Sequence, residues 1–463
     1  MAQSNAVFLE GSLFRHITVM SLTASLGLMA VFLVDFIDMV FISMLGKAEL
    51  AAAVGYAGAI LFFTSSFGIG MSIAAGALVA RALGAGDADA ARMRATTALI
   101  YGFGFGAVFS AVVWGNLHAL TGLVGASGET QELAVGYLRI IIPSLPLLLV
   151  GMVGSAILRA HGAARRAMWV TITGGIVNAV LDPILIFGLD LELTGAALAS
   201  VAARVAIATA AVLPILRFHG GFSRPGLADF ASDFSPIFSL AVPAILTQLA
   251  TPVGQAYVTR AMAEFGEEAV AGMAIVSRLT PVAFGTIFAL SGAVGPIIGQ
   301  NYGAGDTRRV RRAYLDGLLF TGLVVVTVAV LLYILRGPIG ALFQVEGVSR
   351  ELLYLFCGPL ALAWFFNGMV FVSNASFNNL GHPFYSTWIN WGRHTLGTIP
   401  FVILFAAWFG ASGVLIGQAV GGVLFGLLSG WLALRVIARK ADPAEPVPFQ
   451  RQARLMQLFF NRR

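Results

Sequence analysis

Carboxyl and amide side chains lie inside apolar stretches in the first half of the chain. Asp35 and Asp38 belong to the run FLVDFIDMVFISMLG (residues 32–46), and Asn178 and Asp182 belong to NAVLDP. A carboxylate near the centre of a bilayer costs about 2.5–3.5 kcal/mol even on insertion scales, so an acid inside a membrane span indicates function by default. These residues are the first candidates for an ion site.

The spacing places each pair on one helix face. Asp35 and Asp38 are three residues apart, and Asn178 and Asp182 are four apart, which are the separations of neighbours on a helix surface. Asp38 and Asp182 each lie seven residues before the expected outer end of their helix, so the rise of an α-helix puts both about 10 Å deep. Ser200, early in the following helix, reaches a similar depth. The sequence predicts one pocket lined by these five side chains, able to hold a proton or Na⁺, and the spacing does not decide between the two.

The composition is that of a polytopic membrane protein. Of the 463 residues, 58% are hydrophobic and only 11% are charged, with a mean hydropathy of +0.87, as repeated apolar spans of about 20 residues require. The net charge of +6 comes from arginines in short connections and not from one continuous face, which argues against nucleic acid as a partner. The single cysteine, Cys357, excludes a disulfide framework and a zinc-ligand set. The first apolar run is too long for a signal peptide, so we expect it to be retained.

Twelve apolar segments without period-2 alternation predict twelve transmembrane helices. Arginines gather in every second connection, as in residues 81–94, 159–166 and 308–312, while acids are common in the others. This bias places both termini in the cytoplasm. The predicted spans run approximately over 17–45, 50–80, 95–117, 134–158, 168–189, 195–216, 238–262, 269–298, 314–335, 352–377, 385–409 and 413–436.

One six-helix unit occurs twice in the sequence. LGAGD at residues 83–87 returns as YGAGD at 302–306, and the same offset of 219 residues pairs Gly162 with Gly381. Because six is even, both copies enter the membrane from the same side, so we expect two pseudo-symmetric lobes around a central cleft. The predicted division is a cytoplasmic segment 1–14, a first lobe 15–219, a cytoplasmic linker 220–234, a second lobe 235–438 and a polar cytoplasmic tail 439–463.

The second copy lacks the polar residues of the first. The offset takes Asp35, Asp38, Asn178 and Asp182 to Gly254, Tyr257, Gly397 and Phe401. If the acids served only to build the fold, the second copy should need them too, so we interpret them as functional. Asp35 could instead tune Asp38 or pair with Arg204, and Asn178 and Ser200 taken alone could be ordinary contacts between helices.

The second lobe offers candidates of another kind. Aromatic walls suit cation–π capture of organic cations, and the candidate substrate-binding residues are Tyr257, Phe288 and Trp391. For the basic residues inside spans we expect snorkelling or lobe packing; these are Arg278, Arg393 and His394. The histidines lack HExxH spacing and the GAGD loops lack the sequel of a P-loop, so we expect neither an enzyme nor a nucleotide-driven pump, and no cofactor apart from possible Na⁺.

Together these motifs resemble a known family. The run of residues 38–46, the two GAGD loops, NxxLDP at 178–183 and GAALAS at 195–200 follow along nearly the whole chain as in the multidrug and toxic compound extrusion (MATE) family. Its members are twelve-helix exporters that exchange organic, usually cationic, drugs for H⁺ or Na⁺. The resemblance implies that the ion-site acids are Asp38 and Asp182, with Asn178 beside them and a hydroxyl at Ser200. Helices seven, eight, ten and eleven carry no acid within their spans, which favours the DinF-like branch.

The sequence therefore predicts a cation-coupled (H⁺ or Na⁺) antiporter that exports amphipathic, cationic organic compounds across the inner membrane by alternating access. Its expected partners are these substrates, the coupling ion and the lipid bilayer, and the chain is expected to act as a monomer. The alternative is a lipid-intermediate flippase of a related fold. That function would require Arg204, Arg278 and Arg393 to converge on the central cleft.

Overall fold

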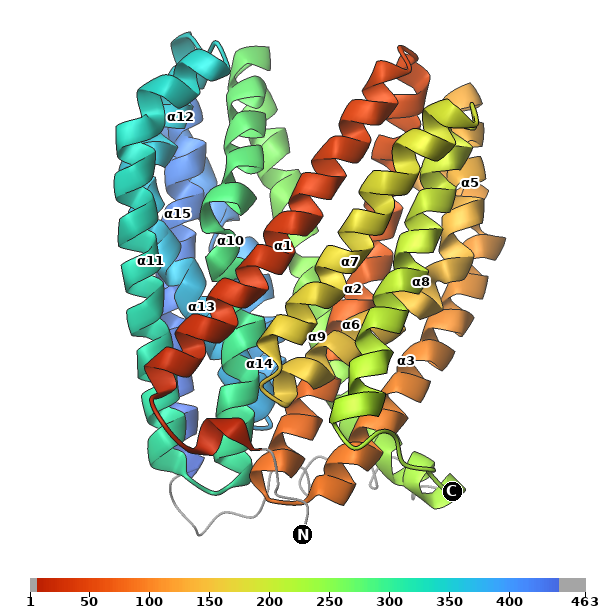
Figure 1. Ribbon diagram of the computed structural model, residues 1–463. Coiled ribbons are helices and arrows are strands. Elements are labelled where there is room, and N and C mark those ends of the chain that lie inside the picture. Colours follow the sequence, from red (N-terminus) through yellow and green to blue (C-terminus); the bar gives the residue numbers. More distant parts are fainter. Residues whose placement is uncertain (1–5, 441–463) are drawn as a thin grey trace, which may run out of the picture. The chain divides into compact units, whose positions relative to one another are not determined.

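The protein is built from helices. The computed structural model describes residues 6–440, in which helices are joined by turns and no strand occurs (Figure 1). Within these residues, eleven helical runs are long and apolar enough to cross a membrane. The all-α polytopic fold predicted from the sequence is confirmed. The predicted tail beyond residue 440, and residues 1–5 of the predicted N-terminal segment, lie outside the described residues.

The last of the eleven runs contains two spans. It extends over 58 residues, Pro383–Lys440, which is nearly twice the length of the other spans and far more than a bilayer needs. Thr395 interrupts it with φ −109° and ψ −81°, and Gly410 does so with φ 59° and ψ −139°. The positive φ at Gly410 is available mainly to glycine, so the chain turns there, between the predicted spans 385–409 and 413–436.

Contacts between residues divide the chain into two compact units. Unit 1 contains Thr23–Ile245, and unit 2 contains Phe8–Leu22 and the chain from Leu246 onward. The boundaries fall inside two long helices, α1 (Leu13–Met44) and α9 (Leu227–Ala263). The first part of each helix is thus assigned to a different unit from the rest. The predicted domain limits in the loops stay predictions.

Unit 1 contains most of the first predicted span and the whole of the next five. Its further elements are α2 (Ala48–Gly84), α3 (Ala88–Gly115), α4 (Leu117–Leu123), α5 (Gly128–Ile141), η2 (Ile142–Ser144), α6 (Leu145–Ala160), α7 (Ala164–Pro183), η3 (Ile184–Gly188) and α8 (Glu192–Phe218). Small residues let α6, α7 and α8 approach closely. A Cβ added at Gly151 or Gly174 would lie 2.3 Å from the Ile207 side chain. Such packing is typical of helices in membranes, and it fixes α7 against α8.

Unit 2 contains the remaining spans. Its further elements are η1 (Val7–Leu9), α10 (Glu267–Gly303), α11 (Thr307–Leu342), α12 (Gly347–Leu355), η4 (Phe356–Leu360), α13 (Ala361–Asn379), α14 (Pro383–His394) and α15 (Ile399–Lys440). The N-terminal segment is bonded into this unit. Phe8 N donates to Gln300 Oε1 (2.9 Å), and Phe8 O accepts from Asn301 Nδ2 (3.1 Å) and Arg309 Nη2 (3.0 Å). The Phe8 side chain is buried, so the start of α1 is fixed to α10 and α11.

The two GAGD loops are helix–turn–helix connections. Gly86 and Gly305 take positive φ values of 78° and 77°, which glycine adopts at little cost at the end of a helix. Asp87 and Asp306 then cap the following helices, accepting from Ala90 N (2.8 Å) and Arg309 N (2.9 Å). The repeated motif is therefore explained by turn geometry.

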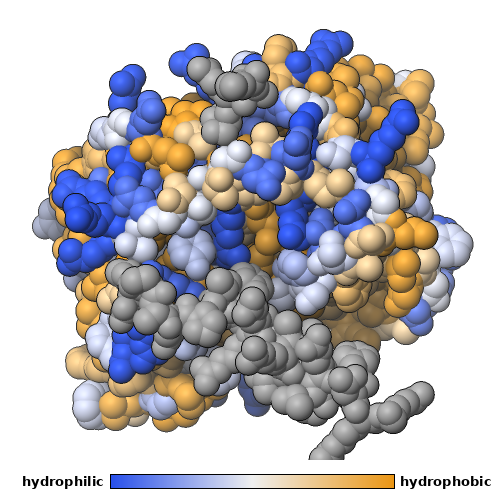
Figure 2. All heavy atoms as spheres, turned by 90° about the horizontal axis from the view of Figure 1, so that it is seen from below, coloured by the Kyte–Doolittle hydropathy of each residue, from blue (hydrophilic) through white to orange (hydrophobic). Residues whose placement is uncertain are grey.

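The flanks of the helices are apolar. On α11, large side chains such as Leu323, Val330 and Ile334 are more than half exposed, as expected where lipid is the solvent. Figure 2 shows one end of the molecule, where hydrophilic side chains gather between hydrophobic flanks. This distribution fits a chain whose helix ends contact water and whose sides contact hydrocarbon.

Candidate functional site

Two of the predicted acids meet in unit 1 through one amide. Asn178 Nδ2 donates to Asp38 Oδ1 (2.9 Å) and to Asp182 Oδ2 (2.7 Å). Asp182 is fully buried and Asn178 is 5% exposed. The structure therefore joins α1 to α7 at the depth where the sequence places both acids.

The two carboxyl groups also interact with each other. The side chains of Asp38 and Asp182 lie within hydrogen-bonding reach, but two carboxylates have no proton to share. Asp182 Oδ1 is buried, and no donor within the described residues reaches it. A proton or a cation between the acids would satisfy this oxygen.

The end of α7 presents these side chains. Asn178 and Asp182 are one turn apart on the same helix face, and Pro183 follows directly. Proline has no N–H and disrupts the regular helix ladder, and here the backbone widens into the π-helical turn η3 before ending at Leu189. Gly195 of α8 packs against this turn, since a Cβ there would lie 2.7 Å from the Leu185 carbonyl. The local break thus positions Asp182 on a rigid segment.

Ser200 is part of a neighbouring hydrogen-bonded group. It is hydrogen-bonded to Tyr137 of α5, whose hydroxyl is near enough to Asp38 and Asp182 to interact electrostatically with both. Arg204, one turn after Ser200, donates from Nη1 to Ile141 O (3.0 Å) and Ser144 Oγ (3.0 Å).

Tyr137 is a neighbour of the candidate site that the sequence analysis did not name. The 219-residue offset pairs it with Phe356, so the second copy keeps the ring and lacks the hydroxyl. The signal for this residue is the same as for the acids, a polar group that is present in the first copy and absent from the second.

Asp35 stands apart from this group. It is exposed and interacts electrostatically with Asp38, one turn further along α1. Arg204 bonds to a carbonyl and a hydroxyl, and no ion pair within the described residues joins it to Asp35. Two alternatives were open for Asp35, tuning Asp38 or pairing with Arg204. The geometry supports the first, because Asp35 interacts with Asp38.

The predicted substrate residues lie in unit 2 in different surroundings. Tyr257 lines a cavity of about 390 Å³ between α9 and α15. Phe288 packs against the rings of Trp364 and Phe371, each at 5.6 Å between centroids. Trp391 Nε1 donates to Leu246 O (2.9 Å) and so joins α14 to α9. Among the described residues, only Tyr257 of the three lines this cavity.

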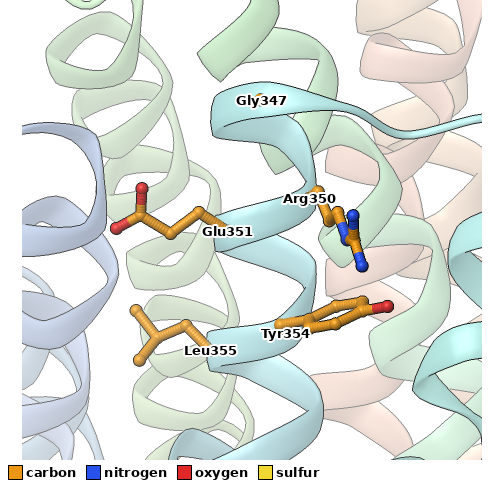
Figure 3. A pocket seen from close by; sticks show the side chains of 5 residues that line it. All are labelled: Gly347, Arg350, Glu351, Tyr354 and Leu355. Carbon is orange, nitrogen blue, oxygen red and sulfur yellow. The ribbon is translucent and has the colours of Figure 1, made fainter.

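A second hollow in unit 2, of about 550 Å³, lies along α12. Figure 3 shows Arg350 beside Tyr354, with Glu351 and Leu355 on the other flank of the helix. The Arg350 guanidinium lies over the Tyr354 ring, at 5.1 Å from its centroid, and Glu351 Oε1 accepts from Ser412 Oγ (2.6 Å). Its charged groups thus already have partners.

The family follows from the sequence match across both units. The family model named MatE matches residues 24–184 and 243–404, which is more than half of the chain. The chain belongs to the MatE family. The two matched segments are the two copies that the 219-residue offset detects, so the MatE region occurs once in each half.

Two relatives of this MatE chain are transporters by name. A Shewanella oneidensis protein named FAD transporter is 29% identical over 439 residues, covering 92% of this chain and 96% of that protein. The multidrug export protein MepA of Staphylococcus aureus is 23% identical over 410 residues, covering 88% and 90%.

Solved MATE structures share the fold. An outward-facing multidrug resistance MATE transporter matches with a TM-score of 0.87 at 23% identity, covering 94% of this chain and 98% of that one. A mutant of the Vibrio cholerae MATE transporter VcmN matches with a TM-score of 0.87 at 24% identity, over 94% and 98%. The predicted membership of the MATE family is confirmed, and the DinF-like branch stays a prediction.

Proposed function

We propose that this MatE protein is an antiporter that exports amphipathic organic compounds, cationic ones among them, in exchange for H⁺ or Na⁺. Membership of the family supports transport of small organic molecules. The observation that carries the coupling is the buried contact of Asp38, Asn178 and Asp182, in which two acids share one amide donor. Residues 6–440 supply no basic partner to neutralise these acids, so a mobile cation is the natural counter-charge.

The ion would act by changing the balance between two conformations. When a proton or Na⁺ binds between Asp38 and Asp182, their mutual repulsion falls and α1 and α7 can stay together. When the ion leaves, the two carboxylates repel each other and the population of the other conformation increases. An ion can shift this balance only by its differential affinity for the two states, and moving a population from 1:99 to 99:1 takes about 5.5 kcal/mol.

The two candidate ions make different demands on Asn178. A proton fits the observed arrangement, because it needs only two facing carboxyl oxygens. Na⁺ needs several oxygen ligands, so the amide would have to turn its Oδ1 toward the acids in place of its Nδ2. The proposed location is the inner membrane, with both termini in the cytoplasm and the chain working as a monomer.

The test is transport by the reconstituted protein. Vesicles loaded with a fluorescent organic cation receive a pH gradient or a Na⁺ gradient separately, which identifies the ion. We expect Asp38→Asn to abolish gradient-driven efflux while the protein remains inserted. Asp89→Asn, at a side chain that is 88% exposed, is the matched control and should transport normally. Full efflux by Asp38→Asn would remove this acid from the mechanism.

The flippase alternative has less support. It needs arginines available to a pyrophosphate, and Arg204 is bonded within unit 1 to Ile141 and Ser144. With Arg204 engaged in this way, the three arginines that a flippase would require are not all available to one ligand. Transport of an aromatic cation, but not of a lipid pyrophosphate, in the same vesicles is the expected result.

A further inference from the structure

Unit 2 contains a buried positive charge that forms no ion pair with any acid of residues 6–440. Arg393, at the end of α14, is only 8% exposed, and a guanidinium remains charged in proteins. Its Nη1 donates to Asn367 Oδ1 (2.6 Å) and its Nη2 bonds to His394 Nε2 (2.9 Å). Its Nε is buried, and no acceptor within the described residues reaches it. Buried charges are normally paired, so this environment lacks an anion.

His394 extends the same group of donors. Because a guanidinium only donates, His394 Nε2 must accept from Arg393, and the ring proton is on Nδ1. A Cβ built at Gly254 of α9 would lie 2.3 Å from this Nδ1. The histidine ring therefore occupies the space that a side chain at position 254 would need, and only glycine at this position leaves room for it.

The backbone is broken beside these side chains. α14 ends at His394, residues 395–398 form turns, and Thr398 Oγ1 donates to Arg393 O (2.8 Å). At membrane depth, non-helical backbone is tolerated where it is buried in protein or lines a cavity. Interrupted helices of this kind often form binding sites in transporters.

A cavity begins one helical turn away on both sides of the break. Tyr257 lies three residues after Gly254 on α9, and Val402 N donates to Thr398 O (2.8 Å) at the start of α15. Both residues line the cavity of about 390 Å³, together with apolar residues such as Ile403 and Ala406 and with two charged residues, Arg260 and Glu264. This volume lies within the range of small-molecule sites.

The first copy has nothing equivalent to this pair. The 219-residue offset takes Arg393 and His394 to Gly174 and Gly175, and it takes Gly254 to Asp35. The acidic group in unit 1 and the basic group in unit 2 are therefore separate specialisations of one repeated fold.

We propose that Arg393, with His394 and Asn367, binds the oxyanion of an organic molecule, a carboxylate or a phosphate, whose apolar body occupies the cavity lined by Tyr257 and Val402. The inference deepens the proposed export function by adding organic anions to its substrates. The guanidinium offers a fork of N–H groups that matches either oxyanion. The oxyanion supplies the negative charge that Arg393 lacks.

The test compares three probes that share one ring system. Anthracene-9-carboxylate, 9-anthracenemethanol and 9-(methylaminomethyl)anthracene are negative, neutral and positive, and their binding to the purified full chain is measured by fluorescence anisotropy in detergent. We expect the carboxylate to bind about tenfold or more tightly than the alcohol, as a charged hydrogen-bonded contact implies. Equal affinity for the carboxylate and the alcohol in the unmodified protein would overturn the proposal, whatever the variants do.

Variants locate the site. Arg393→Gln should reduce the preference for the carboxylate to less than twofold, and Arg393→Lys, which keeps the charge without the fork, should retain part of it. Arg278→Gln, at an exposed arginine of the same unit, is the matched control and should keep the full preference. A preference that survives Arg393→Gln, or that Arg278→Gln removes equally, would contradict the assignment.

Two further measurements distinguish a transported solute from a membrane lipid as the source of the oxyanion. They also distinguish failure of the oxyanion site from failure of the proposed antiport. Uptake of the carboxylate into phosphatidylcholine vesicles assigns the site to transported solutes, whereas competition by phosphatidylglycerol for binding assigns it to lipid phosphate. The binding result in detergent stands without transport, so its failure concerns only the oxyanion site. Failure of wild-type vesicles to move the organic cation under either gradient concerns only the proposed antiport.

Discussion

Asn178 should set how tightly the coupling ion is held. Its one NH₂ group contacts Asp38 at 2.9 Å and Asp182 at 2.7 Å, and the substitution Asn178→Ala removes both contacts. A hydrogen bond to a charged group contributes about 1.5–3 kcal/mol net. Nδ2 donates to the charged, ion-free carboxylates and stabilises them, so its loss should strengthen proton binding. The loss of one such bond corresponds to a rise in proton affinity of about 10- to 150-fold.

The assay is gradient-driven efflux of a fluorescent organic cation from vesicles, measured over a series of H⁺ or Na⁺ concentrations. If H⁺ is the coupling ion, we expect Asn178→Ala to lower the H⁺ concentration for half-maximal efflux by at least tenfold. Asn116→Ala is the matched control, because Asn116 is exposed, directly follows α3 and donates from Nδ2 to Val112 O (2.8 Å) of that helix. An unchanged half-maximal concentration in Asn178→Ala would refute the role of this amide in joining the acids.

Two further predictions concern stability. Asp233 is 3% exposed, accepts from Thr97 Oγ1 (2.6 Å) and forms an ion pair with Arg94. Asp233→Ala should therefore lower the free energy of unfolding by about 2–3 kcal/mol. Thermal unfolding in detergent measures this change, and a decrease in stability no larger than that caused by Asp89→Ala would contradict the prediction. Burial, with the nearby His161 and Arg166, lowers the pKa of His219, just beyond α8, to about 4. The fold therefore favours neutral His219, and stability should fall as the pH drops from about 6.5 toward 4 because the unfolded chain then binds more protons. His219→Gln should reduce the fall in melting temperature between about pH 6.5 and about pH 4. An unchanged dependence of melting temperature on pH would show that His219 is not its cause.

The pairing of Asp38 with Asp182 could be predicted because helices are regular. A fixed rise per residue converts position in a span into depth, and the repeated sequence provides an internal comparison for each residue. The same regularity located the break near Gly410, since the predicted spans end at 409 and begin again at 413.

Other features could not be predicted from local pattern. The sequence left two alternatives open for Arg393 and His394, snorkelling or packing, and local pattern could not choose between them; the structure buries both at the end of α14. Their burial depends on Gly254, which is 140 residues away along the chain and leaves space for the histidine ring. The break after His394 involves Thr395, whose residue type carries no strong turn signal, so only tertiary contacts decide it.

The fixed start of α1 bears on how the two units can communicate. Residues 8–22 belong to unit 2, through the bonds of Phe8 to Gln300, Asn301 and Arg309, while Asp38 lies in unit 1. The seventeen residues from Leu22 to Asp38 form one continuous helical segment, which spans about 24 Å. The acid of unit 1 and the anchored segment of unit 2 are therefore joined by a single run of backbone hydrogen bonds, without any chain of intervening side chains.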